Sequence, residues 1–328
     1  MTREEFLCEF RRIVNRYTKF VISGHIKPDG DSVGACVALA LFLKGLDKTV
    51  CVVYDGASER YAEVAALAPS FEPGEGYEVA RGEFVFIMLD CCEPKRTGGA
   101  QGFFDPAVTS LCIDHHVGGE AYAMYHYVED TASSTCEILY SLFKQEGIEV
   151  TADMAKALFL GVAFDTGGFR HSSTTADTFR MAAELKETGV DSTRIINSLF
   201  HTRGFKESKV LSAVLRKAKL YEGQIVMSCM EQKDFLALGA GAEDAEGVVA
   251  YLAEIKEAEA AVYLREIEPG TIRVNMRSKE WIDVAKAARQ FGGGGHIRAA
   301  GCTVEEPMLL VKQKILDELK KQLPMGER

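Results

Sequence analysis

The chain has 328 residues, of which 47% are hydrophobic and 26% charged, and its formal net charge at pH 7 is −10. This length favours two domains, each with its own core. The acidic balance argues against binding of long nucleic acid, because that mode needs a basic stripe that contacts many phosphates. Short oligonucleotides or mononucleotides held by a few basic groups remain compatible with it.

The nine cysteines are odd in number and scattered, with no Cys-x-x-Cys pair. They favour a reducing compartment over a disulfide framework. The N-terminus lacks an apolar signal core. The longest uninterrupted apolar run, residues 35–43, is far shorter than the roughly 20 residues of a membrane-spanning helix. We therefore expect a cytoplasmic protein without a membrane segment.

The first half of the chain alternates strands with helices. A capping box at Thr2-x-x-Glu5 opens an amphipathic helix. The apolar patterns predict strands at 20–23, 49–54, 84–89 and 109–113 and helices at about 32–43, 135–143, 154–164 and 175–188. Residues 158–164 are also compatible with a buried strand. Such alternation is typical of parallel βαβ units, so we predict an α/β fold with a parallel sheet in the N-terminal domain.

The second half begins after a polar stretch, 189–220, that we interpret as a partly helical linker. It separates an N-terminal domain (1–188) from a smaller α/β C-terminal domain (221–328). In the latter, strands at 261–267 and 271–276 flank the turn Glu268-Pro269-Gly270 as a hairpin. Asp283 is the predicted N-cap of a helix that ends at the glycine run 292–295. Pro307 begins a final amphipathic helix.

Four segments of the N-terminal domain place acids and imidazoles where apolar runs end. Their members are His25, Asp29 and Asp31; Asp90; Asp114, His115 and His116; and Asp165. Ligands of open α/β sheets bind at the carboxyl ends of the strands. Turns and helix caps also use Asp and Gly, so each segment alone would mean little. Because four occur together, the sequence predicts a metal site.

Imidazole and carboxylate ligands without thiolates suit an ion such as Mn²⁺ better than a structural zinc ion. Asp90 is well placed to bridge two ions, and His115 and Asp165 could complete the second. Two such ions, about 4 Å apart, activate a water molecule and stabilise the attacking and leaving oxygens of a displacement at phosphorus. The predicted reaction class is therefore phosphoester hydrolysis.

These residues resemble the four motifs of the DHH phosphoesterase superfamily, which are His25-x-x-x-Asp29-x-Asp31, Asp90, Asp114-His115-His116 and Asp165, in this order. The segment from Gly292 to His296 resembles the glycine-rich signature of the DHH-associated domain, type 1. The resemblance covers nearly the whole chain. It is strongest for the nanoRNase branch of oligoribonucleases and 3′-phosphoadenosine-5′-phosphate phosphatases. It implies an active site in the cleft between the two domains.

The resemblance also implies two Mn²⁺ ions, with Mg²⁺ or Co²⁺ as alternatives. It assigns one ion to His25, Asp29 and Asp90, and the other to Asp31, Asp90, His115 and Asp165. Asp114 then orients an imidazole, and His116 is left to contact the reacting phosphate or to protonate the leaving oxygen. The residues expected to act in catalysis are Asp90, Asp114 and His116.

The glycine run has no Gly-Lys-Ser/Thr ending and follows a helix, which argues against a nucleoside-triphosphate loop. Backbone amides beside an imidazole can still cradle an anion. The resemblance implies that this segment holds the substrate's nucleotide and terminal phosphate. The expected substrate contacts are Arg277, Ser278, Gly293, Gly294, Gly295, His296 and Arg298, together with Arg96 near the metal loops.

We therefore expect a manganese-dependent hydrolase that releases nucleoside monophosphates from very short oligonucleotides and dephosphorylates 3′-phosphoadenosine-5′-phosphate. Phosphodiesterases for linear or cyclic dinucleotides (pApA, pGpG, c-di-AMP) remain an alternative. A family II inorganic pyrophosphatase would share the N-terminal motifs, but the glycine-histidine signature favours a nucleotide substrate. A catalytically silent nucleotide-binding regulator is the alternative from another class. The oligomeric state stays open, with a homodimer as one option.

Overall fold

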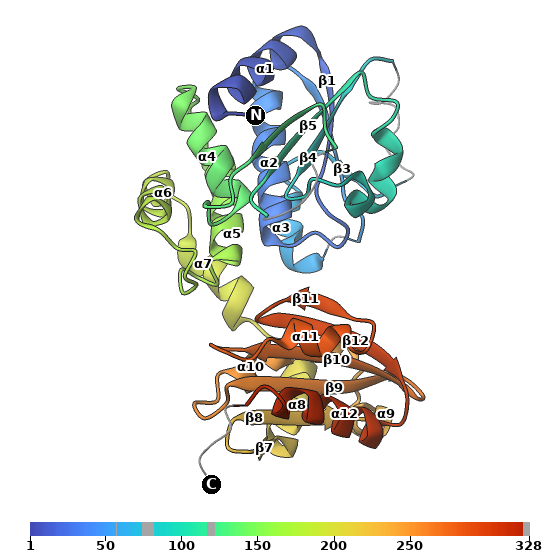
Figure 1. The fold of residues 1–328 in the computed structure, drawn as a ribbon. Coiled ribbons are helices and arrows are strands. Elements are labelled where there is room, and N and C mark those ends of the chain that lie inside the picture. Colours follow the sequence, from blue (N-terminus) through green and yellow to red (C-terminus); the bar gives the residue numbers. More distant parts are fainter. Residues whose placement is uncertain (57, 74–81, 117–121, 324–328) are drawn as a thin grey trace. The chain divides into compact units, whose positions relative to one another are not determined.

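A computed structural model describes residues 1–56, 58–73, 82–116 and 122–323. The chain forms two compact units, Met1–Thr202 and Arg203–Arg328 (Figure 1). The boundary between them falls inside the segment predicted as a linker. That segment contains α7 (Ser192–Ile196) and α8 (Phe205–Lys217), and α8 belongs to the second unit. The placement of the active site in a cleft between the two domains stays a prediction.

The first unit is built on a six-stranded sheet with the order β3-β2-β1-β4-β5-β6. Its strands are β1 (Lys19–Ser23), β2 (Thr49–Val53), β3 (Ser70–Phe71), β4 (Val85–Leu89), β5 (Thr109–Asp114) and β6 (Tyr125–Val128). Each neighbouring pair is parallel, which confirms the predicted parallel sheet. β3 and β6 are missing from the sequence-based prediction, because the first has two residues and the second is a polar, half-exposed edge strand.

Helices cover the sheet of the first unit. They are α1 (Arg3–Arg16), α2 (Gly30–Gly45), α3 (Ala62–Ala65), α4 (Thr135–Gln145), α5 (Ala152–Asp165) and α6 (Ala176–Glu187), with 3₁₀ segments η1 (Glu59–Tyr61) and η2 (Pro94–Phe103) and a π-helical turn η3 (Asn197–His201). Residues 158–164, for which a strand was an alternative, are helical. Figure 1 shows α2 and α5 beside each other, and most residues of both helices are buried.

Both faces of the first sheet are buried, as is usual for parallel sheets. On one face, Phe20, Ile22 and Ile87 pack in the core shared with α1, α2, α4 and α5. On the other, Phe86 and Met88 pack with apolar residues of η2. This double burial explains why the strands read as continuous apolar runs in the sequence. It also leaves the strand ends as the place where polar side chains of this sheet can gather.

The second unit has a mixed sheet with the order β11-β12-β10-β9-β8-β7. Its strands are β7 (Lys219–Tyr221), β8 (Ile225–Met230), β9 (Ala260–Glu268), β10 (Thr271–Ser278), β11 (Gly294–His296) and β12 (Ala299–Glu305). β8 and β9 are parallel, and the other pairs are antiparallel. The predicted hairpin is confirmed as β9 and β10. The glycine run is not simply a turn, because Gly294 to His296 form β11 against β12.

Helices pack on both faces of the second sheet. They are α8, α9 (Gln232–Leu238), α10 (Val248–Ala253), α11 (Val284–Arg289) and α12 (Met308–Lys320), with the 3₁₀ turn η4 (Glu243–Ala245). Ile272 and Val274 contribute to the core with α11 and α12, whereas Ala261 and Tyr263 contribute to the core with α8 and α10. Asp283 caps α11 by accepting a hydrogen bond from the Lys286 amide, as predicted.

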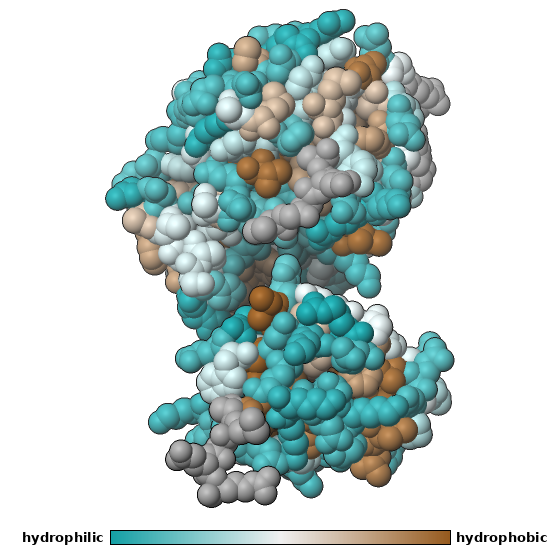
Figure 2. Space-filling model, in the orientation of Figure 1, coloured by the Kyte–Doolittle hydropathy of each residue, from teal (hydrophilic) through white to brown (hydrophobic). Residues whose placement is uncertain are grey.

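Hydrophilic side chains cover most of the surface seen in Figure 2, and hydrophobic ones appear as separate patches. Among the described residues, none of the helices has the length and apolar character needed to cross a membrane.

Candidate metal centre

Three adjacent strands of the first unit, β1, β4 and β5, end at the same edge of the sheet because they are parallel. His25 follows β1, Asp90 follows β4 directly, and Asp114 is the last residue of β5. Asp29 and Asp31 lie at the start of α2, and Asp165 is the last residue of α5. The six metal ligands predicted from sequence, together with Asp114 and His116, therefore come from five elements that converge at one edge.

One group of ligand atoms consists of His25, Asp29 and Asp90. The Nε2 atom of His25 lies 3.5 Å from Asp29 Oδ2 and 3.4 Å from Asp90 Oδ2. The Nδ1 atom of His25 is 2.9 Å from the carbonyl oxygen of Ile26. When Nδ1 carries the proton for that hydrogen bond, the lone pair of Nε2 is free to bind a metal ion.

A second group consists of Asp31, His115 and Asp165, and a third of Asp90, His115 and His116. His115 Nε2 lies 3.1 Å from Asp165 Oδ2 and 3.6 Å from Asp90 Oδ1. In each of the three groups the ligand atoms lie within 4.8 Å of one another. The two oxygens of Asp90 thus face different groups, since Oδ2 faces His25 and Oδ1 faces His115.

Asp90 has a left-handed backbone conformation, with φ of 63°. Few residues other than glycine adopt this conformation, and Asp and Asn are among those that tolerate it. The turn is held by a hydrogen bond of 3.0 Å from the Asp90 amide to the carbonyl of Ile113 in β5. Unfavourable backbone conformations that are fixed in this way concentrate at functional sites.

The N-terminus of α4 also contributes to the site, which the sequence did not predict. Asp31 is fully buried and accepts hydrogen bonds from the backbone amides of Thr135 (2.6 Å) and Cys136 (3.0 Å). The Thr135 hydroxyl donates to Asp90 Oδ1 at 3.2 Å. The sequence signalled the start of this helix through its N-cap residue, Ser134, but gave no sign of the contact with Asp31. A cap signature does not reveal which distant side chain the free amides will meet.

Gly161 of α5 makes room for this arrangement. A Cβ atom at this position would lie 2.5 Å from Asp31 Oδ1 and 2.3 Å from the sulfur of Cys136. Both distances are far below van der Waals contact. The close approach of α5 to Asp31 therefore requires glycine here.

The carboxylates of the site have strongly altered acidities. Burial, together with the charge of Asp31, raises the pKa of Asp90 to about 7. Burial and the charges of Asp31 and Asp29 raise the pKa of Asp165 to about 10. Burial lowers the pKa of His25, but its hydrogen bonds to Asp29 and Asp90 outweigh this and raise the pKa to about 10. Carboxyl groups this close retain protons unless cations balance their charge, so the donor set fits divalent metal ions.

His116 forms a pair with Asp114. Its Nδ1 atom lies 2.7 Å from Asp114 Oδ1, and the backbone amides of His115 and His116 donate to the same oxygen at 2.8 and 3.1 Å. Burial works to raise the pKa of Asp114, but the hydrogen bonds and charge of His116 lower it below its usual value. Asp114 therefore stays ionised and fixes the orientation of the His116 ring, leaving Nε2 for other partners.

Comparison with known families agrees with this geometry. Residues 19–162 match the DHH family, N-terminal domain, and residues 223–324 match the DHHA1 domain. The chain therefore contains a DHH-family N-terminal domain followed by a DHHA1 domain. This confirms the resemblance inferred from the motifs and, with it, the phosphoesterase class of the protein.

Two relatives are similar to this chain over most of its length. The bifunctional oligoribonuclease and PAP phosphatase NrnA of Thermus thermophilus is 29% identical over 295 residues, which are 87% of this chain and 83% of that protein. The protein of the same name from Bacillus subtilis is 25% identical over 299 residues, 90% of this chain and 92% of that protein. The crystal structure of an exopolyphosphatase-related protein from Bacteroides fragilis is similar in fold, with a TM-score of 0.90 at 23% identity and 98% coverage of both chains.

The DHHA1 domain contains most of the predicted substrate contacts. Arg277 and Ser278 end β10, and the glycine run leads into β11 with the exposed His296 at its end. Gly293 has no space for a side chain, because a Cβ atom would lie 2.2 Å from the carbonyl oxygen of Gly301. Gly294 and Gly295 pair with Gly301 and Ala300 of β12. Apart from Gly293, which precedes β11, these residues lie on the two strands that flank β12.

Three of the predicted contact residues already have partners. The Ser278 hydroxyl donates to the carbonyl of Ile282 at 2.6 Å. The guanidinium group of Arg298 donates to the backbone carbonyls of Ile282 and Glu280. In the DHH domain, Arg96 is exposed, and its carbonyl accepts a hydrogen bond of 2.6 Å from the amide next to His25, that of Ile26. Arg96 is thus fixed by its backbone beside the first metal group. Substrate contacts of both arginines stay predictions.

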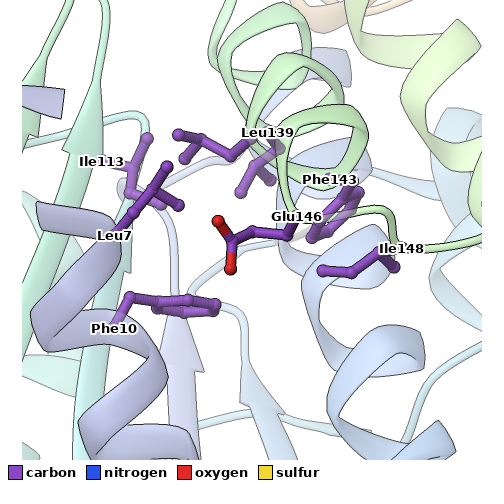
Figure 3. A pocket seen from close by; sticks show the side chains of 8 residues that line it. Leu7, Phe10, Ile113, Leu139, Phe143, Glu146 and Ile148 are labelled. Atoms are coloured by element: carbon purple, nitrogen blue, oxygen red, sulfur yellow. The ribbon is translucent and has the colours of Figure 1, made fainter. Parts of the chain in front are cut away.

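Two cavities of the DHH domain lie outside this site. Figure 3 shows the first, which has a volume of about 10 Å³, room for roughly one water molecule. Its walls are apolar except for Glu146, and that carboxylate is paired with Arg11 at 2.5 Å. The second, about 290 Å³, lies beside α3, α5 and α7, where Glu63 pairs with Lys156 (2.6 Å) and Arg194 (2.9 Å). Neither is lined by a predicted site residue.

Proposed function

We propose that the protein uses two divalent cations, Mn²⁺ in the first place and Mg²⁺ or Co²⁺ as alternatives, to hydrolyse very short oligonucleotides to nucleoside monophosphates. We propose that it also dephosphorylates 3′-phosphoadenosine-5′-phosphate. The observation that carries this proposal is the position of Asp90, whose two carboxylate oxygens face separate groups of ligands. The relatives named as oligoribonuclease and PAP phosphatase support the choice of substrates.

In the proposed site, His25, Asp29 and Asp90 hold one cation, and Asp31, Asp90, His115 and Asp165 hold the other. When bound, such cations act as Lewis acids and lower the pKa of a bound water molecule. The four carboxylates, Asp29, Asp31, Asp90 and Asp165, balance the four positive charges. Thr135 holds Asp90 by its hydroxyl, and the amides of α4 hold Asp31, so both carboxylates keep a fixed orientation.

His116 is the proposed general acid for the leaving oxygen. Its ring is oriented by the 2.7 Å hydrogen bond from Nδ1 to Asp114, and the ionised carboxylate stabilises the protonated imidazole. Asp114 acts through His116 and is therefore a positioning residue. On the DHHA1 domain, Arg277, Ser278, Gly294, Gly295 and His296 are proposed to bind the nucleotide. The amide of Gly293 donates to the carbonyl of Ala288 at 3.0 Å, so this residue supports the segment through its backbone.

The test uses the full chain, stripped of metal with a chelator and reloaded with Mn²⁺, Mg²⁺ or Co²⁺. Substrates are dinucleotides, a ladder of longer oligonucleotides, 3′-phosphoadenosine-5′-phosphate, pyrophosphate and cyclic dinucleotides, and product release is followed by chromatography. We expect turnover of dinucleotides and of the bisphosphate that falls steeply with oligonucleotide length. Turnover of pyrophosphate alone, or of cyclic dinucleotides alone, would replace the proposed substrates. A complete lack of turnover with every metal would favour a nucleotide-binding regulator.

Asp90→Asn is the decisive variant, since Asn tolerates the left-handed backbone and keeps the size of the side chain. We expect it to lose all activity and one equivalent of bound Mn²⁺ or more. The matched control is Asp130→Asn, which removes the charge of an exposed aspartate and should leave both readouts unchanged. An Asp90→Asn variant with normal turnover would overturn the assignment of the bridging ligand.

A further inference from the structure

The DHHA1 domain presents an aromatic side chain to solvent beside the predicted nucleotide-binding segment. Trp281 is the single tryptophan of the chain, and 48% of its surface is exposed. It lies in the connection between β10 and α11, three residues after Ser278. Its neighbour Ile282 is fully buried in the core with α11 and α12. The chain therefore anchors Ile282 in the core and directs the preceding, larger residue Trp281 outward.

The connection that carries Trp281 is fixed by a buried carboxylate. Glu259 is 5% exposed. Its carboxylate oxygen Oε1 accepts hydrogen bonds from the amides of Glu280 (3.0 Å), Trp281 (2.7 Å) and Ile282 (3.0 Å). Three amides that converge on one carboxylate oxygen hold three consecutive residues in place. The backbone that carries the indole ring is thus held in one conformation.

The same connection is held through its carbonyl groups. Arg298 donates to the carbonyls of Glu280 and Ile282, and the Ser278 hydroxyl donates to that of Ile282 at 2.6 Å. The amide of Ser278 donates in turn to the Arg298 carbonyl at 3.1 Å. Because Arg298 comes two residues after His296, these bonds attach the Trp281 connection to the end of the glycine-histidine segment.

These contacts explain what Arg298 does in the fold, and about half of the surface of Trp281 stays exposed on this fixed backbone. A half-exposed indole ring on a rigid support has little conformational entropy to lose on binding. Flat aromatic rings of this kind stack on nucleobases, and every base offers a face for such stacking. Stacking therefore adds affinity for a nucleotide without selecting its sequence.

We infer that Trp281 is a stacking platform for a nucleobase of the substrate whose phosphate is held by Arg277 and the glycine-histidine segment. The ligand class is a purine or pyrimidine nucleotide. This inference rests on the proposed function, because it names a base-binding contact of the same substrate. It assigns Trp281 to substrate affinity and leaves the chemical step to the DHH domain.

The first test uses the fluorescence of the full-length protein, since all tryptophan emission comes from Trp281. AMP should quench this emission in a saturable manner, whereas ribose 5-phosphate, which has no base, should not. Equal quenching by both, or quenching by neither, would overturn the inference. This readout needs no turnover and therefore separates the inference from the proposed function. If AMP quenches the emission but no nucleotide is hydrolysed, only the proposed function fails.

The second test compares KM and kcat. Trp281→Leu should raise the KM for a dinucleotide roughly 5- to 100-fold, with kcat changed little, and Trp281→Phe should restore most of the affinity. A dinucleotide that lacks one base should show a smaller difference between wild type and Trp281→Leu. The matched control is Phe205→Leu, at an aromatic residue of the same unit that is 77% exposed. An unchanged KM in Trp281→Leu would refute the stacking contact.

Discussion

The crowding of carboxylates around Asp165 leads to a prediction for stability without metal. At pH 7 the unfolded chain ionises this group, whereas in the folded protein its pKa is about 10 instead of the usual 3.8. Between 3.8 and pH 7 lie 3.2 pH units (7.0 − 3.8). Each of these pH units adds about 1.4 kcal/mol to the free-energy cost of keeping the group protonated in the folded protein. Keeping this carboxyl protonated therefore costs at most about 4–5 kcal/mol.

Asp165→Asn removes this cost because an amide cannot ionise, and its oxygen can keep the contact of 3.1 Å with His115. We expect a net gain of about 1–3 kcal/mol in the metal-free protein, since partial solvent access to the carboxyl group reduces the full figure. For a unit of this size, that corresponds to a rise of roughly 3–10 °C in Tm.

The pH dependence has a defined sign. An acid whose pKa is raised by folding contributes stability below its unfolded pKa, and this contribution is lost as pH rises towards the folded value. Wild type without metal should therefore lose stability between about pH 4 and pH 10, and Asp165→Asn should lose less. Mn²⁺ should reverse the order of the two proteins, because the variant lacks a ligand.

The assay is calorimetry of the full chain after chelation, and the relevant transition is the one that Mn²⁺ shifts. Asp130→Asn again serves as the control for loss of one negative charge. A metal-free Asp165→Asn protein that melts below wild type, or no higher than Asp130→Asn, would refute the reasoning that this carboxyl is held against its preferred ionisation.

Three further substitutions test the supports of the site. Gly161→Ala places a methyl group against Asp31, so urea unfolding should show a loss of about 1–3 kcal/mol and calorimetric titration a weaker affinity for Mn²⁺; an unaltered protein would show that α5 can move aside. Thr135→Val removes the hydroxyl that holds Asp90 and should weaken Mn²⁺ binding by about 10- to 100-fold, with Thr135→Ser restoring it. His116→Gln should lower kcat by about 10²- to 10⁴-fold while bound Mn²⁺ stays at the wild-type level, and loss of metal instead would make His116 a ligand.

The convergence of the site was predictable because a parallel sheet brings the carboxyl ends of its strands to one edge. Asp90 and Asp114 follow apolar runs of strand length, so their meeting with His25 follows from the βαβ pattern alone. Asp165 reaches the same place from the end of helix α5. The apolar run before it was compatible with either a helix or a strand. The family motifs, more than periodicity, assigned it to the site.

Other parts of the site depend on contacts between distant segments and had no local signal. The amide of Thr135 meets Asp31 across 104 positions of the chain. Arg298 was expected to contact substrate, and its bonds to backbone carbonyls follow from the path of the chain after β10. The glycine run reads as a turn, but pairing with β12 makes part of it a strand. Residue types alone do not show such partners.

The contact between Asp31 and the start of α4 also has a consequence for how the protein acquires its metal. A carboxylate on an early helix is oriented only after a helix more than a hundred residues later has docked. Contacts of such long range form late in folding because closing the intervening loop is entropically expensive. A nascent or partly folded chain would therefore bind cations poorly, and tight binding would report that the native topology is complete.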